Sequence, residues 1–540
     1  MLHIPQLQDT QPGVFYDHFS NTIAPGSDEE RSRFRMLQER LVQQFKSVFP
    51  NPRAPRTVVV IPSLSMDDVV LKKISGVEYY EERMLCLLML LRLPRTNLIY
   101  VTSQPLAPTI IDYYLSLLPD IPAAHALNRL TLLSCHDAEA IPLSQKILYR
   151  PRLLRRIRAA IPDVRAAHMT CFNATPLERS LAVRLDIPLY ACDPDQCFGG
   201  TKSTSREAFR ETGILLPDGF ENLTSTDEMA EALAALKGRN PDLRRAVVKV
   251  EEGASGEGNA VFPFEDAPRG RALTRWIKQN LPQRLRYEAR METWDAYQAK
   301  FNELGGIVEC FIEGAEKQSP SMQGRIDPLG TQELISTHDQ VLGGPSGQIF
   351  LGCTFPAAPA YRLEIQRLGL QVGEILHRHD VLGRFGVDFV SVPRGEGWDH
   401  YAIEINIRKG GTTHPFLMLQ FLTDGMLDPE TGLFHTRTGL TRSYYASDNL
   451  MNPIYRGFRP EDLMEIALDH NLHFNGATQE GVVFHLIGAL SQFGKLGVVC
   501  ISDSIDAARK LYLETVYVLD QEALAQEKVR RILYTYGKDS

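Results

Sequence analysis

The sequence of residues 383–406 predicts that three oxygen-bearing side chains lie side by side on one face of a hairpin. Side chains alternate between the two faces of a strand, so Glu404 and Asn406 point the same way. Residues 383–390 predict a second strand, whose Asp388 stands beside them across a hairpin. Magnesium prefers such oxygen ligands and shares its coordination with substrate phosphates. A polar hairpin face explains any one of these residues, but three in register indicate a magnesium–nucleotide site.

Two cations and a glycine turn follow the asparagine directly, as Arg408-Lys409-Gly410-Gly411. A guanidinium can hold a carboxylate through two parallel hydrogen bonds or offset a developing oxyanion, whereas a lysine cannot bind bidentately. We therefore expect Arg408, with Lys409, to face the reacting carboxylate of a substrate.

Two lysines precede this segment in settings that favour phosphate binding. Lys202 lies at the start of a predicted helix, and helix starts attract anions. Lys249 lies inside an apolar strand, residues 245–250, and a glycine-rich segment, residues 251–259, follows it. Backbone N–H groups of such a loop can wrap phosphate oxygens, although a glycine-rich hairpin turn has the same pattern. The lysine before the loop and the strand predicted after it favour phosphate binding.

Residues 306–317 predict a further apolar strand that is followed by a glycine. Glu309 and Glu316 lie seven residues apart in this segment. Such a connector can present backbone donors and acceptors to the edge of an adenine ring.

Composition limits the class of protein. The chain has 540 residues, a formal net charge of -8 and 44% hydrophobic residues, which suits a globular enzyme and gives no basic excess for nucleic acid. Eight cysteines show neither zinc spacing nor the density of a disulfide-stapled domain. The first 21 residues do not have the pattern of a signal peptide, and the most apolar run, residues 84–91, is too short to span a bilayer. We expect a cytoplasmic protein.

The first half predicts an α/β unit with a parallel sheet. Short apolar strands at residues 58–61, 97–102, 130–133 and 167–172 alternate with helices. This is a Rossmann-like arrangement, but residues 62–67 lack the glycine-rich dinucleotide fingerprint. Ligands in such sheets bind at the carboxyl ends of strands. The candidates there are Ser63, Ser103, Asp137 and Asn173, with helix capping the more frequent role for the two serines.

In their order and spacing, these motifs resemble the ATP-grasp carboxylate–amine ligases. The likeness extends to the pheganomycin-type ATP-grasp peptide ligases, and it covers roughly residues 57–520. The segments that carry it are Lys202, Lys249 with residues 253–258, residues 309–316, residues 336–344, Asp388, residues 404–415 and residues 481–485. Better known dipeptide-forming relatives have a small uncharged turn where this chain has Arg408 and Lys409, so their amino acid specificity does not transfer simply.

The resemblance implies a Rossmann-like pre-ATP-grasp domain, an ATP-grasp fold and a small α/β C-terminal appendage. The implied boundaries are 1–50 for an N-terminal arm, 51–195, 196–450 and 451–540. It implies that Lys202 and Lys249 hold the phosphates and that Ala254, Ser255 and Gly256 close over them. It further implies that Glu309, the main chain of Cys310 and Ile312, and Glu316 hold adenine and ribose. Asp388, Glu404 and Asn406 would coordinate two Mg2+ ions, with Mn2+ as a substitute.

The function implied is an ADP-forming ligase. It activates a carboxylate as an acyl phosphate and joins it to an amine, an amino acid or a peptide, in specialised peptide metabolism such as natural product biosynthesis. Its partners are small molecules, with no nucleic acid or membrane, and a homodimer is compatible with the resemblance. Two alternatives remain: an ATP-binding regulatory protein without ligase chemistry, and phosphoryl transfer to an acceptor other than a carboxylate.

Overall fold

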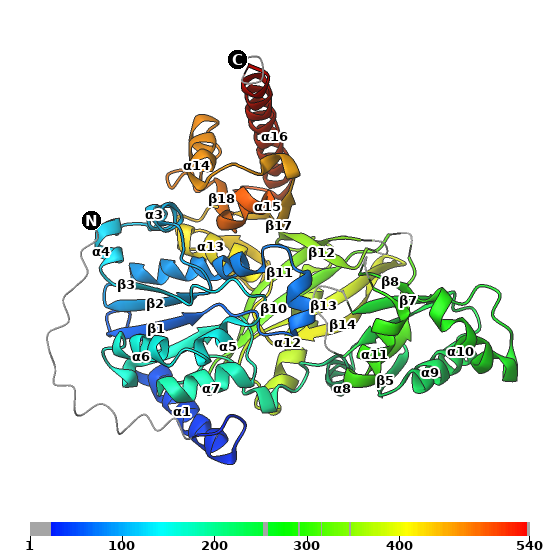
Figure 1. Cartoon of the computed structure of the whole chain (residues 1–540). Coiled ribbons are helices and arrows are strands. Elements are labelled where there is room, and N and C mark those ends of the chain that lie inside the picture. Colours follow the sequence, from blue (N-terminus) through cyan, green and yellow to red (C-terminus); the bar gives the residue numbers. More distant parts are fainter. Residues whose placement is uncertain (1–22, 252–257, 290–291, 315, 345–346, 537–540) are drawn as a thin grey trace.

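The computed structural model describes residues 23–251, 258–289, 292–314, 316–344 and 347–536. These residues form three larger sheets, and the parallel one lies beside the largest (Figure 1). The α/β class predicted from the sequence is confirmed.

The N-terminal sheet is parallel, with strand order β3-β2-β1-β4. Its first strand is buried along its whole length because alternate residues enter two cores: Val58 and Val60 pack on one face, and Val59 and Ile61 on the other. Its strands are β1 (Arg56–Ile61), β2 (Thr96–Thr102), β3 (Leu130–Ser134) and β4 (Ala167–Cys171). The helices are α2 (Asp68–Lys73), η1 (Val77–Arg92), α3 (Pro108–Ser116), α4 (Ala123–Leu127), α5 (Leu143–Leu148), α6 (Pro151–Ala159), η2 (Val164–Ala166) and α7 (Pro176–Leu185).

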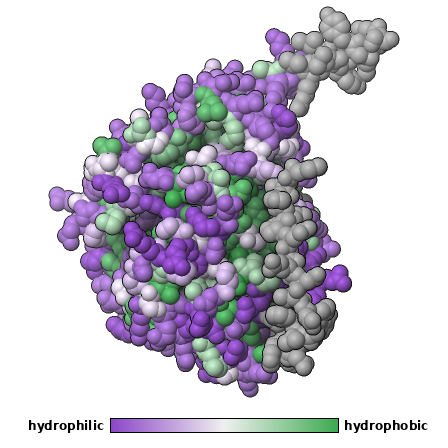
Figure 2. Space-filling view, turned by 90° about the vertical axis from the view of Figure 1, so that its left-hand side faces the viewer, coloured by the Kyte–Doolittle hydropathy of each residue, from purple (hydrophilic) through white to green (hydrophobic). Residues whose placement is uncertain are grey.

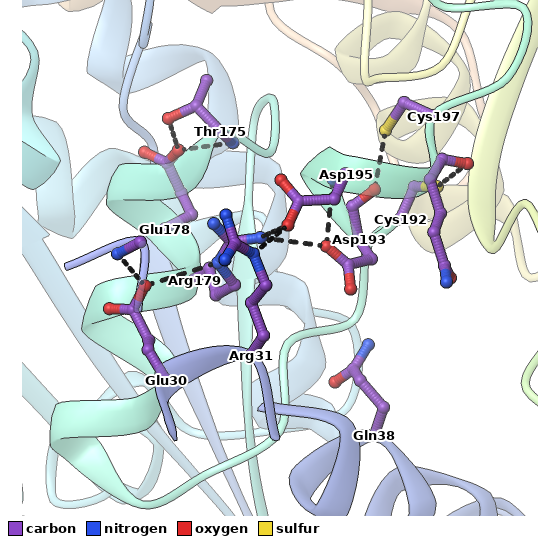
Figure 3. A network of polar contacts seen from close by, with 12 residues as sticks. Glu30, Arg31, Gln38, Thr175, Glu178, Arg179, Cys192, Asp193, Asp195 and Cys197 are labelled. Carbon is purple, nitrogen blue, oxygen red and sulfur yellow. Dashed lines mark hydrogen bonds and ion pairs between the residues drawn. The ribbon is translucent and has the colours of Figure 1, made fainter. Parts of the chain in front are cut away.

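The helix before this sheet, α1 (Asp28–Ser47), packs against α7 through a buried ion cluster. Figure 3 shows Arg179 between Glu30 of α1 and two aspartates that precede the central part of the chain. Its guanidinium lies 2.6 Å from Asp195, 3.3 Å from Asp193 and 3.5 Å from Glu30, and its side chain is only 2% exposed. Arg179 therefore ties α1 to the linker that leaves the N-terminal unit.

The largest sheet has eight strands, in the order β14-β13-β10-β11-β12-β17-β19-β18. Helix α12 (Arg362–Arg378) covers one face, where Met322, Phe385 and Val387 are buried. The strands are β10 (Pro320–Ile326), β11 (Gln332–Gly343), β12 (Ile349–Phe355), β13 (Gly383–Arg394), β14 (Gly397–Asn406), β17 (Ser443–Met451), β18 (Gly481–His485) and β19 (Lys495–Ser502). The strands of the predicted C-terminal α/β segment thus extend this sheet.

The third sheet has strand order β5-β9-β6-β7-β8 and carries helices on one face. Val248 and Val308 point into the core under these helices, so the alternate residues Lys249 and Glu309 lie on the opposite face. The strands are β5 (Gly219–Leu223), β6 (Arg245–Val250), β7 (Asn259–Pro263), β8 (Arg286–Tyr287) and β9 (Gly306–Cys310). The helices of this region are η3 (Pro194–Gln196), α8 (Lys202–Thr212), α9 (Thr226–Arg239), η4 (Gly270–Ala272), α10 (Leu273–Arg284) and α11 (Trp294–Leu304).

The remaining elements surround β17 to β19, and the C-terminal helix extends away from the body (Figure 1). They are α13 (Thr413–Thr423), β15 (Met426–Asp428), β16 (Leu433–His435), η5 (Pro453–Tyr455), α14 (Pro460–Asp469), η6 (Ile487–Ala489), α15 (Leu490–Phe493) and α16 (Ile505–Tyr536). The face in Figure 2 is mostly hydrophilic, with apolar side chains scattered among polar ones. Across the described ranges, no helix is both long enough and apolar enough to cross a bilayer.

The ion cluster around Arg179 makes a testable contribution to stability. Arg179→Leu leaves Glu30 buried without its cation, so we expect the free energy of unfolding to fall by about 3 kcal/mol. Arg31→Leu is the matched control, because Arg31 contacts Asp195 from a half-exposed position and should leave the unfolding midpoint nearly unchanged. Chemical denaturation followed by circular dichroism measures both, and equal midpoints for the two variants would contradict this role.

Candidate functional site

The predicted carboxylate hairpin forms as expected. Strands β13 and β14 pair antiparallel, with Asp388 opposite Glu404 and Gly386 opposite Asn406. Because the register fixes the face, all three polar side chains lie on the side of the sheet away from α12. The Asn406 amide donates to Asp388 at 3.0 Å. The structure thus brings the three predicted metal ligands together.

The two carboxylates repel each other in a buried setting. Burial, and then the charge of Glu404, raise the pKa of Asp388 to about 7. Gln340 of β11 donates to the other Asp388 oxygen at 2.8 Å, and the charge of Arg408 acts in the opposite direction on its pKa. A divalent cation would relieve this repulsion, and an all-oxygen donor set suits Mg2+. Within the described ranges, no group of three histidines, cysteines or carboxylates could form a metal site, and the third predicted ligand here is the amide of Asn406.

Lys202 reaches the hairpin from the first turn of α8. Its ammonium lies 3.6 Å from Glu404 and donates to the Glu251 carbonyl at 3.4 Å. Ser205, one turn along, accepts from the Ile405 backbone at 3.1 Å, which docks the helix on β14. The Glu251 carboxylate accepts from the Ser203 amide at 3.0 Å, so an anion already occupies the helix start.

Lys249 and Glu309 face each other on adjacent strands. Their ammonium and carboxylate lie 2.6 Å apart, and Arg206 of α8 binds the second Glu309 oxygen at 2.9 Å. All three side chains are buried. Glu309 therefore fixes Lys249 on the face that Lys202 also approaches.

The other predicted nucleotide residues are less closely grouped. The Cys310 amide donates to the Asp218 carbonyl at 2.7 Å where β9 ends, and burial raises the pKa of its thiol to about 11. Ile312 is half-buried just beyond, and Glu316 is exposed. The predicted phosphate-covering residues Ala254, Ser255 and Gly256 lie outside the described residues.

Arg408 and Lys409, the two cations that follow the hairpin, point to different parts of the molecule. The charge of Arg408 acts on both Asp388 and Glu404, whereas burial lowers its own pKa. Lys409 instead turns to the end of β4, where it donates to the Thr170 hydroxyl at 3.0 Å and to the Cys171 carbonyl. The structure therefore keeps Arg408 within electrostatic reach of the carboxylate pair and places the Lys409 amine against the N-terminal unit.

The glycine turn is also constrained by its surroundings. A Cβ on Gly411 would come within 2.6 Å of the Phe350 ring of β12, which explains a glycine at this position.

The polar residues at the ends of the parallel strands are engaged within the N-terminal unit. Ser103 binds Glu81 at 2.5 Å, Asp137 binds Arg150 at 2.7 Å, and Asn173 binds the Ser65 backbone. Ser63 accepts from the Ser144 amide in the first turn of α5. Ser63 thus binds an amide at the start of α5 without being the N-cap residue of that helix, which is Pro142.

Two residues of the site were missed in the sequence. Arg206 lies four residues after Lys202, so helical spacing places both on one face, a signal that was available. Gln340 reaches Asp388 only through the pairing of β11, β10 and β13, which no local pattern encodes.

Comparison with known proteins identifies the class of fold. A family model described as "IQCH-like, ATP-grasp" matches residues 269–430, and one described as "PGM1 C-terminal domain" matches residues 462–515. The biotin carboxylase domain of the Hydrogenobacter thermophilus 2-oxoglutarate carboxylase, solved with MgADP, ADP and bicarbonate, has a similar fold. The TM-score is 0.50 at 11% identity, over 83% of this chain and 86% of that one. The fold is therefore the ATP-grasp fold.

Curated relatives then give the family. The L-propargylglycine–L-glutamate ligase of Streptantibioticus cattleyicolor is 31% identical over 462 residues, covering 84% of this chain and 92% of that protein. The IQ motif-containing protein H of Danio rerio is 21% identical over 94% of this chain and 52% of that protein. The chain belongs to the ATP-grasp family and is an ATP-dependent carboxylate–amine ligase, as the sequence predicted. ATP with Mg2+ is the cofactor set of this family.

The anchoring of Lys249 predicts a stability effect at the site. Glu309→Gln leaves Lys249 and Arg206 buried without their shared anion, so we expect a loss of about 3 kcal/mol in the free energy of unfolding. We also expect a smaller rise of the unfolding midpoint when MgADP is added. Glu313→Gln is the control: that carboxylate pairs with Arg245 but is 46% exposed, and its loss should cost less than about 1 kcal/mol. Equal losses in both variants would contradict a positioning role for Glu309.

Proposed function

We propose that this ligase joins two amino acids, or an amino acid and a peptide, through an acyl phosphate, and that it belongs to the pheganomycin-type subgroup. The observation that carries the proposal is the Asp388–Glu404 pair, with the Lys202 ammonium 3.6 Å from Glu404 and Arg408 close enough that the charges of both carboxylates oppose the burial that lowers its pKa. The match to the PGM1 C-terminal domain and the ligase relative, named for two amino acid substrates, support it. A cytoplasmic site of action, specialised peptide metabolism and homodimer formation are further expectations.

In the first step, an oxygen of the substrate carboxylate attacks the γ-phosphorus of ATP. The bond from that phosphorus to the β–γ bridging oxygen breaks, so ADP leaves and an acyl phosphate forms. Lys202 and Lys249 offset charge on the phosphates. Arg408 holds the carboxylate in line and keeps water from replacing it.

In the second step, the amine nitrogen attacks the acyl carbon. The carbon–oxygen bond to phosphate then breaks, inorganic phosphate leaves, and the proton of the amine passes to solvent. Arg408 donates to the oxyanion of the tetrahedral intermediate. Because phosphate is already a good leaving group, no nucleophile from the protein is needed, and we assign no catalytic serine, cysteine or histidine.

We expect Asp388, Glu404 and the Asn406 amide oxygen to hold two Mg2+ ions. Metal charge held there would offset phosphate charge and the repulsion that raises the pKa of Asp388. The Asn406 amide nitrogen, which now donates to Asp388, would have to turn its oxygen towards the ion.

Product analysis tests the chemistry. The protein is incubated with ATP, Mg2+ and a panel of amino acid and peptide pairs, and the products are identified by chromatography and mass spectrometry. We expect ADP, phosphate and an amide in equal amounts. AMP with pyrophosphate would exclude the mechanism, and a stable phosphorylated product would favour phosphoryl transfer to another acceptor. Binding of ATP without substrate-dependent hydrolysis would favour a regulatory protein.

The carboxylate hairpin predicts a loss of activity without a loss of fold. Glu404→Ala removes a metal ligand and should lower kcat by at least about 1,000-fold, since metal charge stabilisation is worth several kcal/mol. Relief of repulsion with Asp388 offsets the loss of the Lys202 contact, so the unfolding midpoint should stay near that of the wild type. Glu396→Ala, in the exposed turn of the same hairpin, is the control and should retain full activity. An active Glu404→Ala enzyme would remove the metal assignment.

A further inference from the structure

The sheet face that carries the carboxylate pair continues past it to a row of arginines. Along β10 and β13, Ser321 pairs with Asp388, Gln323 with Gly386, and Arg325 with Arg384. Side chains two and four residues from Asp388 share its face, so Arg384 lies about 13 Å along the strand from the metal ligands. Arg408 follows the end of β14 by two residues, and the charge of Arg384 acts on the next residue, Lys409.

Arg384 has no partner of its own. In the part of the chain that the structure describes, no hydrogen bond or ion pair holds its guanidinium, although the residue is half-buried. Two fully buried arginines elsewhere in the described chain are paired with carboxylates: Arg179 with Glu30, and Arg206 with Glu309. Isolated buried charge is costly, so an unpaired arginine here calls for an anion.

The surroundings of Arg384 are positively charged. Arg325 lies opposite it and pairs with Glu333, while Lys409 approaches from the other side. Burial, and then the charge of Arg325, lower the pKa of Arg384 to about 10, and burial and Arg384 lower that of Lys409 to about 8. Arg325, Arg384 and Lys409 thus lie close enough for their charges to act on one another in sequence, and the nearest carboxylates, Glu333 and Asp327, lie on the Arg325 side.

Buried polar atoms without partners lie on the neighbouring strands and in the N-terminal unit. In the described ranges, the Ser336 hydroxyl, the Arg325 Nε and the Tyr190 hydroxyl each have no hydrogen-bond partner. Ser336 is 1% exposed and pairs with Gln323, so it lies on the face of Arg384. Tyr190 interacts electrostatically with both Arg325 and Arg384 from the N-terminal unit. Gly386 lies under the Gln323 side chain. A Cβ at position 386 would come within 2.8 Å of the Gln323 amide nitrogen.

We propose that Arg384, with Arg325 and Tyr190, forms a subsite for a substrate carboxylate other than the one that is activated. This inference rests on the proposed function and extends it. Arg408 and Arg384 would hold the two ends of one reaction complex, with the reacting group at Arg408 and the second carboxylate at Arg384. That carboxylate belongs either to the amine-donating amino acid or to a dicarboxylic acid substrate, and the charge recognition is the same for both.

The test uses the full-length enzyme with a pair of amino acids that product analysis shows to be joined. Arg384→Gln is compared with Arg394→Gln, an exposed arginine on the same strand whose side chain is 76% accessible. We expect Arg384→Gln to raise the KM of one amino acid about 30-fold, the loss of one charged hydrogen-bonded contact, while kcat and the KM of ATP stay within about threefold. Arg384→Lys should recover part of the affinity, and Arg394→Gln should change nothing.

Carboxamide analogues identify the source of the carboxylate. The amino acid whose KM rises in Arg384→Gln is replaced by its analogue with an amide at each non-activated carboxylate in turn. For wild type, the KM of one of these analogues should be about 30-fold higher than that of its parent. Wild type and Arg384→Gln should then have the same KM for that analogue. An effect on the amine donor places its carboxylate at Arg384, and an effect on the acid substrate places a second carboxylate there.

Stability separates this role from a structural one. Because Arg384 has no partner to lose, Arg384→Gln should keep or raise the unfolding midpoint without ligand. An unchanged KM for every substrate, or a lower midpoint with equal losses for all substrates and for ATP, would overturn the subsite. Failure of the proposed function itself would differ from both, since wild type would then form no amide with any pair.

Discussion

The buried repulsion between Asp388 and Glu404 is the interaction on which the site depends. Antiparallel pairing of β13 and β14 places the two carboxylates side by side, and burial raises the pKa of Asp388 to about 7. Such a pair is stable only with positive charge nearby. The protein supplies part of it through Lys202 and Arg408. A magnesium–nucleotide complex would supply the rest, which links metal binding directly to substrate binding.

The rest of the fold delivers cations to this pair from separate elements. Helix α8 brings Lys202 and docks on β14 through Ser205, while Arg206 and Glu309 fix Lys249 on the neighbouring sheet. The N-terminal unit instead binds the Lys409 amine at the end of β4, so of the two adjacent cations only Arg408 acts on the pair. Three separate units therefore meet at the residues that follow β14, and the specificity of the enzyme is expected where they meet.

Local patterns in the sequence predicted the hairpin and the grouping of its three polar side chains, because strand alternation determines the face of Glu404 and Asn406 once Asp388 is paired. The parallel sheet was equally predictable from its short apolar strands. The sequence did not predict that Arg408 and Lys409 point to different places. Beyond the end of a strand, the direction of a side chain depends on tertiary contacts, here those of Lys409 with Thr170 and Cys171. Gln340 and Arg384 were beyond reach because their roles arise from pairing between strands distant in sequence.

The central claim, that the carboxylate pair serves the activation of a substrate carboxylate by ATP, is tested most directly by following oxygen. The acid substrate is labelled with 18O in its reacting carboxylate, and the inorganic phosphate formed during amide synthesis is analysed by mass spectrometry. An acyl phosphate predicts one 18O atom in each phosphate, since the attacking oxygen leaves with the phosphoryl group. Phosphate without label, or label recovered in AMP, would contradict the account.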